Sequence, residues 1–281
     1  MASKSLRTKL IEFANSNALT APLWRRYRAR RLVARSALKN VFHCCTQKTA
    51  SQWFRGVFND PVFTDHTGLT SHPYVALGLD TAEKITTPFP LGTIVTHLYI
   101  DYDTYLGIPK TEPYRTFFVM RDPRDVVVSW YFSAKKSHAL IPPIPEMRAA
   151  LEKLDEENGF RYIIDKIDSF GYFRAQRSWI RSRDDSHCRI FLYEDLARDN
   201  DAFLKTLLAY LGIEMDEASF ARLCERNSFK RLAGGREQGD EDADSHYRKG
   251  VAGDWRKYFT PGIQEHLDAV TGDLVSALGY E

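Results

Sequence analysis

Residues 41–58 read VFHCCTQKTASQWFRGVF, an apolar run, a short polar loop and a second run that predicts a helix from about Ala50 to Phe58. The first run, 41–46, has the length and apolar character of a strand buried in a parallel sheet. A strand end and a helix start joined by a tight loop present unpaired backbone N–H groups and the positive end of the helix dipole to one place. The stretch therefore predicts a β-α unit whose loop can bind an anion.

The rest of the chain repeats this alternation. Short apolar runs predict strands at 93–99, 115–121 and 189–193, and longer patterns predict helices at 125–137, 160–181 and 196–211. This is the order of right-handed βαβ units. A chain of 281 residues, 43% of them hydrophobic, can bury one large core. We therefore predict an α/β fold, a single domain over 41–281 with a central parallel sheet flanked by helices.

Charge divides the chain unevenly. Residues 1–40 contain ten Lys and Arg and one acidic residue, whereas the remainder has 29 basic and 36 acidic residues. We interpret 1–40 as a basic helical segment, and its stretch 24–35 (WRRYRARRLVAR) as either a solvated helix face or a surface for an acidic partner or a membrane. No apolar run approaches the ~20 residues of a membrane-spanning helix, and the N-terminus lacks the apolar core of a secretory signal. We expect a cytoplasmic protein with no transmembrane segment and no nucleic-acid partner.

The cysteines give no sign of a disulfide or a metal centre. None of the four forms a C-x-x-C pair, and two adjacent ones lie in the apolar run at 41–46, where buried free thiols are common. We expect neither a disulfide nor zinc, and no other metal, at Cys44, Cys45, Cys188 and Cys224.

The loop after the first predicted strand carries one cation and two hydroxyls. Lys48 adds a full charge, and Thr49 and Ser51 can donate to the oxygens of a phosphate. The G-x-x-x-x-G-K-[ST] pattern of P-loop NTPases is absent, because the loop contains no glycine. Taken alone, the loop is equally consistent with a structural turn.

A second polar stretch, RDPRDVVVSWY at 121–131, follows the strand predicted at 115–121. Pro123 suits a helix start, and Arg121 and Ser129 could converge on a second anion. Two separated anion sites suggest a bisphosphate. The alternative is that Arg124 and Asp125 form a surface ion pair with Arg121 beside it.

A third stretch, RKGVAGDWR at 248–256, places two cations before a glycine. Gly250 lets the backbone come close to a ligand, and Arg248 and Lys249 supply a guanidinium fork and a point charge for a phosphate. Charged residues in loops are usually only solvated, so this stretch alone does not indicate a binding site. It does so only in combination with the stretches around Lys48 and Arg121.

Together, and in this order, the three stretches resemble the PAPS-dependent sulfotransferases across about 41–265, where PAPS is 3′-phosphoadenosine 5′-phosphosulfate. The family's loop P-K-S-G-T-x-W is QKTASQW here, with Gln47 and Ala50 replacing proline and glycine. Alanine tolerates a left-handed backbone poorly, so this replacement bears directly on the backbone conformation of the loop. The R-[ND]-P-x-D-x-x-x-S-x-Y and R-K-G-x-x-G-D-W motifs match without exception.

The resemblance implies a P-loop-kinase-like sulfotransferase fold that binds PAPS and releases adenosine 3′,5′-bisphosphate (PAP). YEDL at 193–196 and SFK at 228–230 are similar to the family's adenine-side segments. The residues implied to bind the nucleotide are Lys48, Thr49, Ala50, Ser51, Gln52, Trp53, Arg121, Ser129, Tyr193, Ser228, Phe229, Arg248, Lys249 and Gly250.

The resemblance also implies the catalytic groups. His97 in VTHL occupies the place of the family's base, and Lys48 would meet the charge on the departing nucleotide. Val95 stands where the family often has a lysine. The acceptor would be a small molecule with a hydroxyl or amine, and the aromatics Phe63, Tyr74 and Phe89 in an otherwise unmatched segment suit an apolar one.

Two further features concern loops and assembly. The glycine-rich acidic segment 233–246 lacks periodicity and predicts a surface loop that orders when nucleotide binds. The family's dimerisation stretch corresponds to Arg256, Thr260, Pro261 and Glu265, and proline in place of valine makes dimerisation by that route doubtful.

Two other functions are consistent with parts of the sequence. An ATP-dependent small-molecule kinase of related α/β fold would need a Walker loop, which is absent. A non-catalytic nucleotide-binding or membrane-docking protein would need neither His97 nor Lys48.

Overall fold

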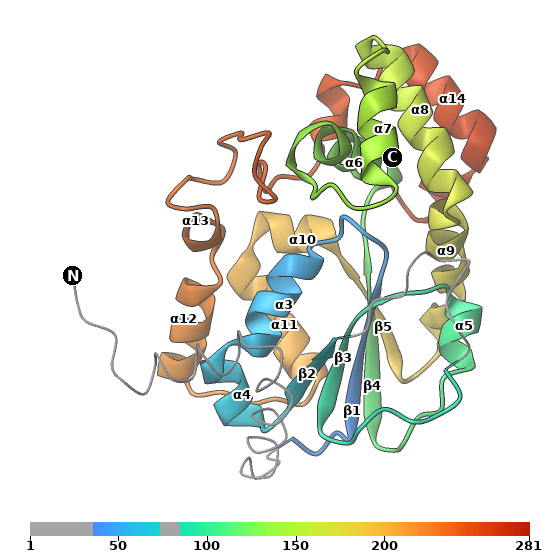
Figure 1. Cartoon of the computed structure of the whole chain (residues 1–281). Coiled ribbons are helices and arrows are strands. Elements are labelled where there is room, and N and C mark those ends of the chain that lie inside the picture. Colours follow the sequence, from blue (N-terminus) through green and yellow to red (C-terminus); the bar gives the residue numbers. More distant parts are fainter. Residues whose placement is uncertain (1–35, 74–84) are drawn as a thin grey trace.

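The computed structural model describes residues 36–73 and 85–281, and the basic segment predicted at 1–40 lies almost wholly outside them. The five strands of the described chain form one parallel sheet in the order β2-β3-β1-β4-β5 (Figure 1). The strands are β1 (Asn40–Cys45), β2 (Thr70–Pro73), β3 (Thr93–Tyr99), β4 (Tyr114–Met120) and β5 (Cys188–Leu192). The predicted α/β fold with a central parallel sheet is confirmed, and β2 is an edge strand that was not predicted.

Helices cover both faces of the sheet because its strands are apolar on both sides. All six residues of β1 are buried. One face packs against α3 (Ser51–Asn59), α4 (Pro61–Thr67), α11 (Asn200–Tyr210) and α12 (Glu217–Arg226). The other face shares a hydrophobic cluster with α5 (Tyr102–Leu106), α6 (Pro123–Phe132), α7 (Ile144–Leu151), α8 (Glu156–Ser169), α9 (Tyr172–Ser178) and α14 (Pro261–Thr271), of which α6, α7 and α14 lie beyond the carboxyl end of the sheet in Figure 1.

Two predicted helices are divided in the structure. The helix predicted over 160–181 is α8, α9 and the 3-10 turn η2 (Trp179–Asp184), and Gly171 separates α8 from α9 with a left-handed φ of 74°. The helix predicted over 196–211 is α10 (Tyr193–Arg198) followed by α11. Asp199 separates them, because its carboxylate caps the first N–H groups of α11. The helix predicted over 125–137 is α6 and a π-helical turn, η1 (Ser133–Ser137).

The parallel sheet places several loops at one edge. Since all strands run the same way, the segments after β1, β3, β4 and β5 leave at their carboxyl ends. The chain moves from β1 to β3 on one side of the sheet and then to β4 on the other, so the loops after β1 and β4 diverge. This is the position at which open α/β sheets bind ligands.

The C-terminal third of the chain covers this edge. After α13 (Phe229–Leu232), the segment 233–253 forms a loop at the same end of the sheet as the start of α3 (Figure 1). Arg236 holds the loop by donating to the carbonyl groups of Asp240, Tyr247 and Arg248. A 3-10 turn, η3 (Asp254–Lys257), α14 and α15 (Leu274–Ala277) follow. Ordering of 233–246 on nucleotide binding stays a prediction.

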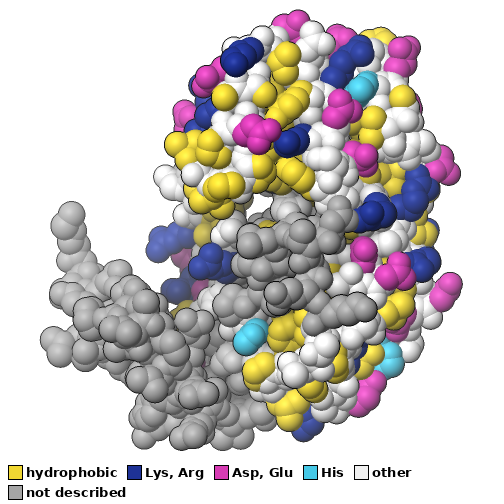
Figure 2. All heavy atoms as spheres, turned by 45° about the vertical axis from the view of Figure 1, so that its right-hand side comes forward, with side chains coloured by type: hydrophobic (Ala, Val, Ile, Leu, Met, Phe, Trp, Pro, Cys, Tyr) yellow, Lys and Arg dark blue, Asp and Glu magenta, His cyan; other side chains and the backbone are white. Residues whose placement is uncertain are grey.

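Acidic and basic side chains are intermixed over the described part of the face in Figure 2. No helix within 36–73 or 85–281 has the length and apolarity to cross a membrane.

All four cysteines are free thiols. Phe63 is fully buried in the core and Phe89 packs against Phe42, while Tyr74 lies outside the described residues.

Candidate functional site

A cavity of about 270 Å³ opens at the carboxyl edge of the sheet, between the loops that follow β1 and β4. Three cations from distant parts of the chain line it: Lys48 after β1, Arg121 after β4 and Arg248 from the C-terminal loop. Of the residues predicted to bind a nucleotide, twelve line this cavity: Lys48, Ala50, Ser51, Gln52, Trp53, Arg121, Ser129, Tyr193, Phe229, Arg248, Lys249 and Gly250.

The loop after β1 is held in an unusual backbone conformation. Lys48 and Ala50 have φ of 68° and 63°, both in the left-handed region that non-glycine residues rarely adopt. The buried Thr49 does not line the cavity, because its hydroxyl donates to the carbonyl group of Thr46 at 2.7 Å. Arg121 donates to the Lys48 carbonyl oxygen at 2.7 Å. The loop thus adopts a left-handed turn although it contains no glycine.

Replacing Ala50 with glycine should therefore stabilise the protein. A left-handed backbone costs an alanine about 1–2 kcal/mol, and glycine removes this strain. Glycine also makes the unfolded chain more flexible, which lowers stability by about 0.4–1 kcal/mol and offsets part of the gain. We expect Ala50→Gly to raise the free energy of unfolding by roughly 0.5–1 kcal/mol, measured by denaturant titration. The control, Ala221→Gly in the exposed middle of α12, should lower it by about 1 kcal/mol. A loss of stability in Ala50→Gly would contradict this account.

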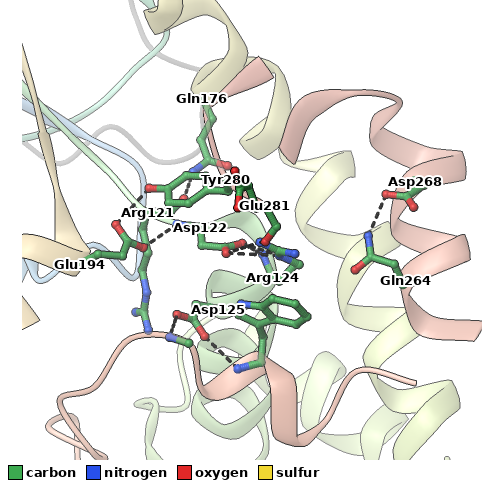
Figure 3. Close-up of polar contacts among 12 residues, drawn as sticks. Arg121, Asp122, Arg124, Asp125, Gln176, Glu194, Gln264, Asp268, Tyr280 and Glu281 are labelled. Carbon is green, nitrogen blue, oxygen red and sulfur yellow. Dashed lines mark hydrogen bonds and ion pairs between the residues drawn. The ribbon is translucent and has the colours of Figure 1, made fainter. Parts of the chain in front are cut away.

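Arg121 is buried at the end of β4 and contacts both the loop after β1, at Lys48, and the start of α10, at Tyr193. Gln176 fixes its backbone by donating to the Arg121 carbonyl oxygen at 2.8 Å (Figure 3). Its guanidinium lies over the Tyr193 ring, 3.9 Å from the centroid. Its buried Nε has no hydrogen-bond partner in the described chain. A buried guanidinium with a donor to spare is suited to an anion.

Asp125 ties the C-terminal loop to α6. Its carboxylate accepts from the backbone N–H groups of Gly253 at 2.6 Å and Trp255 at 2.9 Å (Figure 3). The carboxylate is almost completely buried, so it is not part of a surface ion pair with Arg124. Asp125 instead brings the stretch 248–256 to the start of α6, next to Arg121.

Arg124 is also buried and belongs to a second hydrogen-bonded network, which is separate from the residues that line the cavity (Figure 3). Its guanidinium donates to both carboxylate oxygens of Asp122, stacks on the Trp255 ring at 3.7 Å and donates to the Glu281 carbonyl oxygen at 2.7 Å. The backbone N–H of Asp122 donates to Glu194, which also accepts from the Tyr280 hydroxyl. The C-terminal residues therefore help to hold the turn that carries Arg121.

Arg248 and Lys249 are paired with carboxylates in this structure. Both contact Asp254 at 2.5 Å, and Arg248 also contacts Glu241 at 2.5 Å. Gly250 follows with φ of 71°, and a Cβ atom there would overlap the Phe229 ring. Glycine is needed at this position both for the backbone and for the close approach of that ring.

Aromatic residues surround the cavity on the side of α3 and α13. The Trp53 indole N–H donates to the Asn227 carbonyl oxygen at 2.9 Å, so this residue is part of the core as well as of the cavity lining. Phe229 and Tyr193 also line the cavity. Ser228 does not line it, because its hydroxyl caps α13 and donates to the Glu225 carbonyl oxygen.

His97 lies at the carboxyl end of β3 but is not among the residues that line this cavity. The register between β1 and β3 shifts where Thr96 and His97 lie opposite His43, and such bulges redirect side chains. The His97 ring packs on Tyr99, which lines the cavity, with centroids 4.7 Å apart. Burial and, to a smaller extent, Arg55 lower the pKa of His97 to about 4.

Several lining residues were not predicted from the sequence. Ser51 accepts from the Tyr99 hydroxyl at 3.0 Å, and Trp130 lies near Lys48. Trp130 occupies an unspecified position of the matched motif, and the two histidines belong to no motif. The main unpredicted lining residues are Tyr99, Trp130, His138, His246 and Tyr247.

The three cations affect one another. Burial, followed by the charges of Arg121 and Arg248, lowers the pKa of Lys48 to about 7. Gathered positive charges of this kind are unfavourable unless an anion offsets them. The cavity is therefore arranged for a strongly anionic ligand with aromatic surfaces beside it.

Comparison with known sequences agrees with this chemistry. Mouse Sulfotransferase 1A1 is 25% identical over 222 residues, which cover 75% of this chain and 70% of the relative. Mouse Sulfotransferase 1B1 is 26% identical over 69% of this chain and 64% of its own. Human Sulfotransferase 1C2 is 24% identical over 54% of this chain and 52% of its own. The match thus spans about half to two thirds of the last two relatives.

Solved structures show the same fold. Mouse sulfotransferase SULT7A1, complexed with PAP, superposes with a TM-score of 0.61 at 22% identity, covering 85% of this chain and 87% of that one. Retinol dehydratase, in complex with androsterone and PAP, gives a TM-score of 0.53 at 17% identity, covering 89% and 85%. The family model described as the sulfotransferase domain matches residues 36–279, and the chain belongs to this family.

Proposed function

We propose that this protein is a PAPS-dependent sulfotransferase that moves a sulfuryl group to a hydroxyl or amine of a small-molecule acceptor. The observation that carries the proposal is the gathering of Lys48, Arg121 and Arg248 around one cavity in a chain of this family. PAPS carries roughly four negative charges, counted as for phosphate esters. These three cations, together with Lys249 of the closing motif, would offset them.

The nucleotide's two anionic groups would occupy opposite ends of the cavity. The 5′-phosphosulfate would meet the loop after β1 and the start of α3, and the 3′-phosphate would meet Arg121, Ser129 and the stretch 248–250. Trp53, Tyr193 and Phe229 offer flat surfaces for the adenine. PAP binding would have to displace Asp254 or Glu241 from Arg248, or use donors that those contacts leave open.

Sulfuryl transfer should resemble phosphoryl transfer, with an in-line, loose transition state in which charge grows on the bridging oxygen of the departing nucleotide. Lys48 is the cation that we propose for that charge. The acceptor hydroxyl must lose a proton, and His97 is the base that the family resemblance assigns. A pKa of about 4 leaves the ring neutral at pH 7 but makes it a weaker base than an ordinary histidine, since a general base works best with a pKa near the operating pH.

Incubation of the protein with PAPS and a panel of alcohols, phenols and amines tests the activity, with a mass gain of one sulfuryl group on the acceptor as the expected result.

A kinase would instead bind ATP with magnesium. We expect PAP to raise the melting temperature without magnesium and ATP to leave it unchanged. The opposite result would favour the kinase.

Replacing His97 with alanine tests the base. We expect kcat to fall by about 10²–10⁴-fold while the Kd for PAP stays unchanged, because the side chain would act on the acceptor's proton alone. This result would also exclude a purely nucleotide-binding role. Unchanged kcat in His97→Ala would show that another group takes the proton. A cytosolic location stays a prediction.

A further inference from the structure

Tyr99 belongs to no motif of the sequence, yet it lies beside the loop that carries Lys48. It is the last residue of β3 and is paired in register with Cys45, the last residue of β1. Since β1 and β3 are parallel neighbours, both strands end at the same edge of the sheet. The Tyr99 side chain therefore lines the cavity together with Lys48 and Ser51.

A hydrogen bond joins Tyr99 to the start of α3. The Tyr99 hydroxyl donates to the Ser51 Oγ at 3.0 Å. Burial and then the Cys45 side chain raise the pKa of Tyr99, against the opposing effect of the Ser51 bond, so the phenol keeps its proton at neutral pH. A serine hydroxyl has one proton and two lone pairs. Within the described chain the Ser51 hydroxyl accepts this bond and donates none, so its own proton is left for a ligand in the cavity.

The start of α3 has no side-chain cap. Ala50 occupies the N-cap position, and its methyl group cannot accept from the first N–H groups of the helix. These N–H groups and the positive end of the helix dipole attract an anion. Ser51 is the first helical residue, and its side chain faces the same cavity. A donating Ser51 hydroxyl would therefore add to the attraction of the helix start for an anion.

The Tyr99 ring has a separate contact, with His97. The two rings pack at an interplanar angle of 39°, with centroids 4.7 Å apart. Phenylalanine at position 99 can keep this packing and loses only the hydroxyl. A substitution can therefore separate the bond to Ser51 from the contact with His97.

We propose that Tyr99 is a positioning residue for the donor, because its bond to Ser51 directs the Ser51 proton to an oxygen of the 5′-phosphosulfate. The inference rests on the proposed function, in which this end of the nucleotide meets the loop after β1 and the start of α3. Hydrogen bonds in a chain polarise and strengthen one another. Without the Tyr99 hydroxyl, Ser51 would lose the partner that fixes its rotation, and its bond to the anion would weaken. Tyr99 thus acts through Ser51 rather than by contact with the nucleotide.

The Kd values of PAP and adenosine 3′-phosphate test the inference, since only PAP has a phosphate at the 5′ position. In calorimetric titrations of the full chain, we expect Tyr99→Phe to raise the Kd of PAP about fivefold and to leave that of adenosine 3′-phosphate unchanged. The matched control is Tyr105→Phe, because the Tyr105 hydroxyl is also bonded to a hydroxyl, that of Thr116 at 2.7 Å, but does not line the cavity. This control should change neither Kd. An unchanged Kd of PAP in Tyr99→Phe, or an equal loss for both nucleotides, would overturn the inference and leave the proposed function intact.

A double-mutant cycle shows whether Tyr99 acts through Ser51. We expect Ser51→Ala to raise the Kd of PAP about tenfold, and Tyr99→Phe/Ser51→Ala to bind PAP no more weakly than Ser51→Ala alone. Independent effects would instead multiply to about fiftyfold. That result would also overturn the inference, because Tyr99 would then act without Ser51. Failure of the unmodified protein to bind PAP would overturn the proposed function and the inference with it.

Discussion

Lys48→Met is expected to slow sulfuryl transfer by about 10²–10³-fold and, at the same time, to make the ligand-free protein more stable. The variant loses the cation that we propose for the charge on the departing nucleotide, and removal of one such group typically costs about 10²–10³-fold in kcat. The same cation is unfavourable without ligand, since burial and then the charges of Arg121 and Arg248 lower its pKa to about 7. Methionine has a similar length and no charge.

The stability gain should depend on pH in a defined direction. Between pH 7 and 10.5 the unfolded chain keeps a proton on Lys48 that the folded chain has released, so the stability of the unmodified protein rises with pH in this window. Below about pH 7 the full cost of the buried charge is present. Because Lys48 is partly open to the cavity, we expect a cost on the order of 2–3 kcal/mol, smaller than the pKa change alone implies.

Thermal unfolding at pH 7 and pH 10 checks this prediction. Lys48→Met should melt several degrees above the unmodified protein at pH 7, and the difference should shrink at pH 10. Lys205→Met, an exposed position on α11, is the matched control and should change neither melting temperature nor kcat. A melting-temperature difference that grows with pH would contradict the argument.

The predicted strands and the observed ones agree because buried parallel strands are continuous apolar runs. The strand predicted at 115–121 is Tyr114–Met120, and that at 93–99 is observed with the same bounds. The edge strand β2, with the sequence TSHP, has no such run and contains a proline, so a local pattern could not find it. Gly171, which divides the helix predicted over 160–181, is visible in the sequence, but a single glycine is also tolerated inside many helices.

The candidate site was predictable where residues follow strand ends and was not predictable where loops meet. Lys48, Arg121 and Tyr193 each come shortly after a strand of one parallel sheet, so topology brings them to one edge. The contact between His138 and His246 depends instead on how two loops fold over that edge. No local pattern encodes this contact.

The burial of charged pairs was also hidden from the sequence. Arg124 and Asp125 are adjacent and of opposite charge, which is typical of a surface pair, yet they turn to different partners inside the fold. Asp125 accepts from two backbone N–H groups, and Arg124 pairs with Asp122. The N–H groups of Gly253 and Trp255 become available to Asp125 only when the later part of the chain has folded onto α6, whereas the Arg124–Asp122 pair forms within one turn.

Arg124→Met is expected to be strongly destabilising, by about 3–5 kcal/mol in the free energy of unfolding. Both side chains of the Arg124–Asp122 pair are about 6% exposed. Removing the guanidinium leaves a buried carboxylate without its charge partner, which costs far more than the pair contributes by itself. It also removes the stacking on Trp255 and the bond to Glu281. Denaturant titration measures the loss, and Arg198→Met, which breaks the exposed Arg198–Asp195 pair, should cost less than about 1 kcal/mol.

A second substitution separates the unpaired charge from the lost packing. Asp122 caps α6 by accepting from the backbone N–H of Arg124, and asparagine can keep that cap without a charge. The double variant Asp122→Asn/Arg124→Met should therefore be more stable than Arg124→Met alone, by about 1–3 kcal/mol. If the two were equally unstable, the cost would come from the lost contacts with Trp255 and Glu281. The C-terminal residues, rather than the buried charge, would then be what holds the turn carrying Arg121.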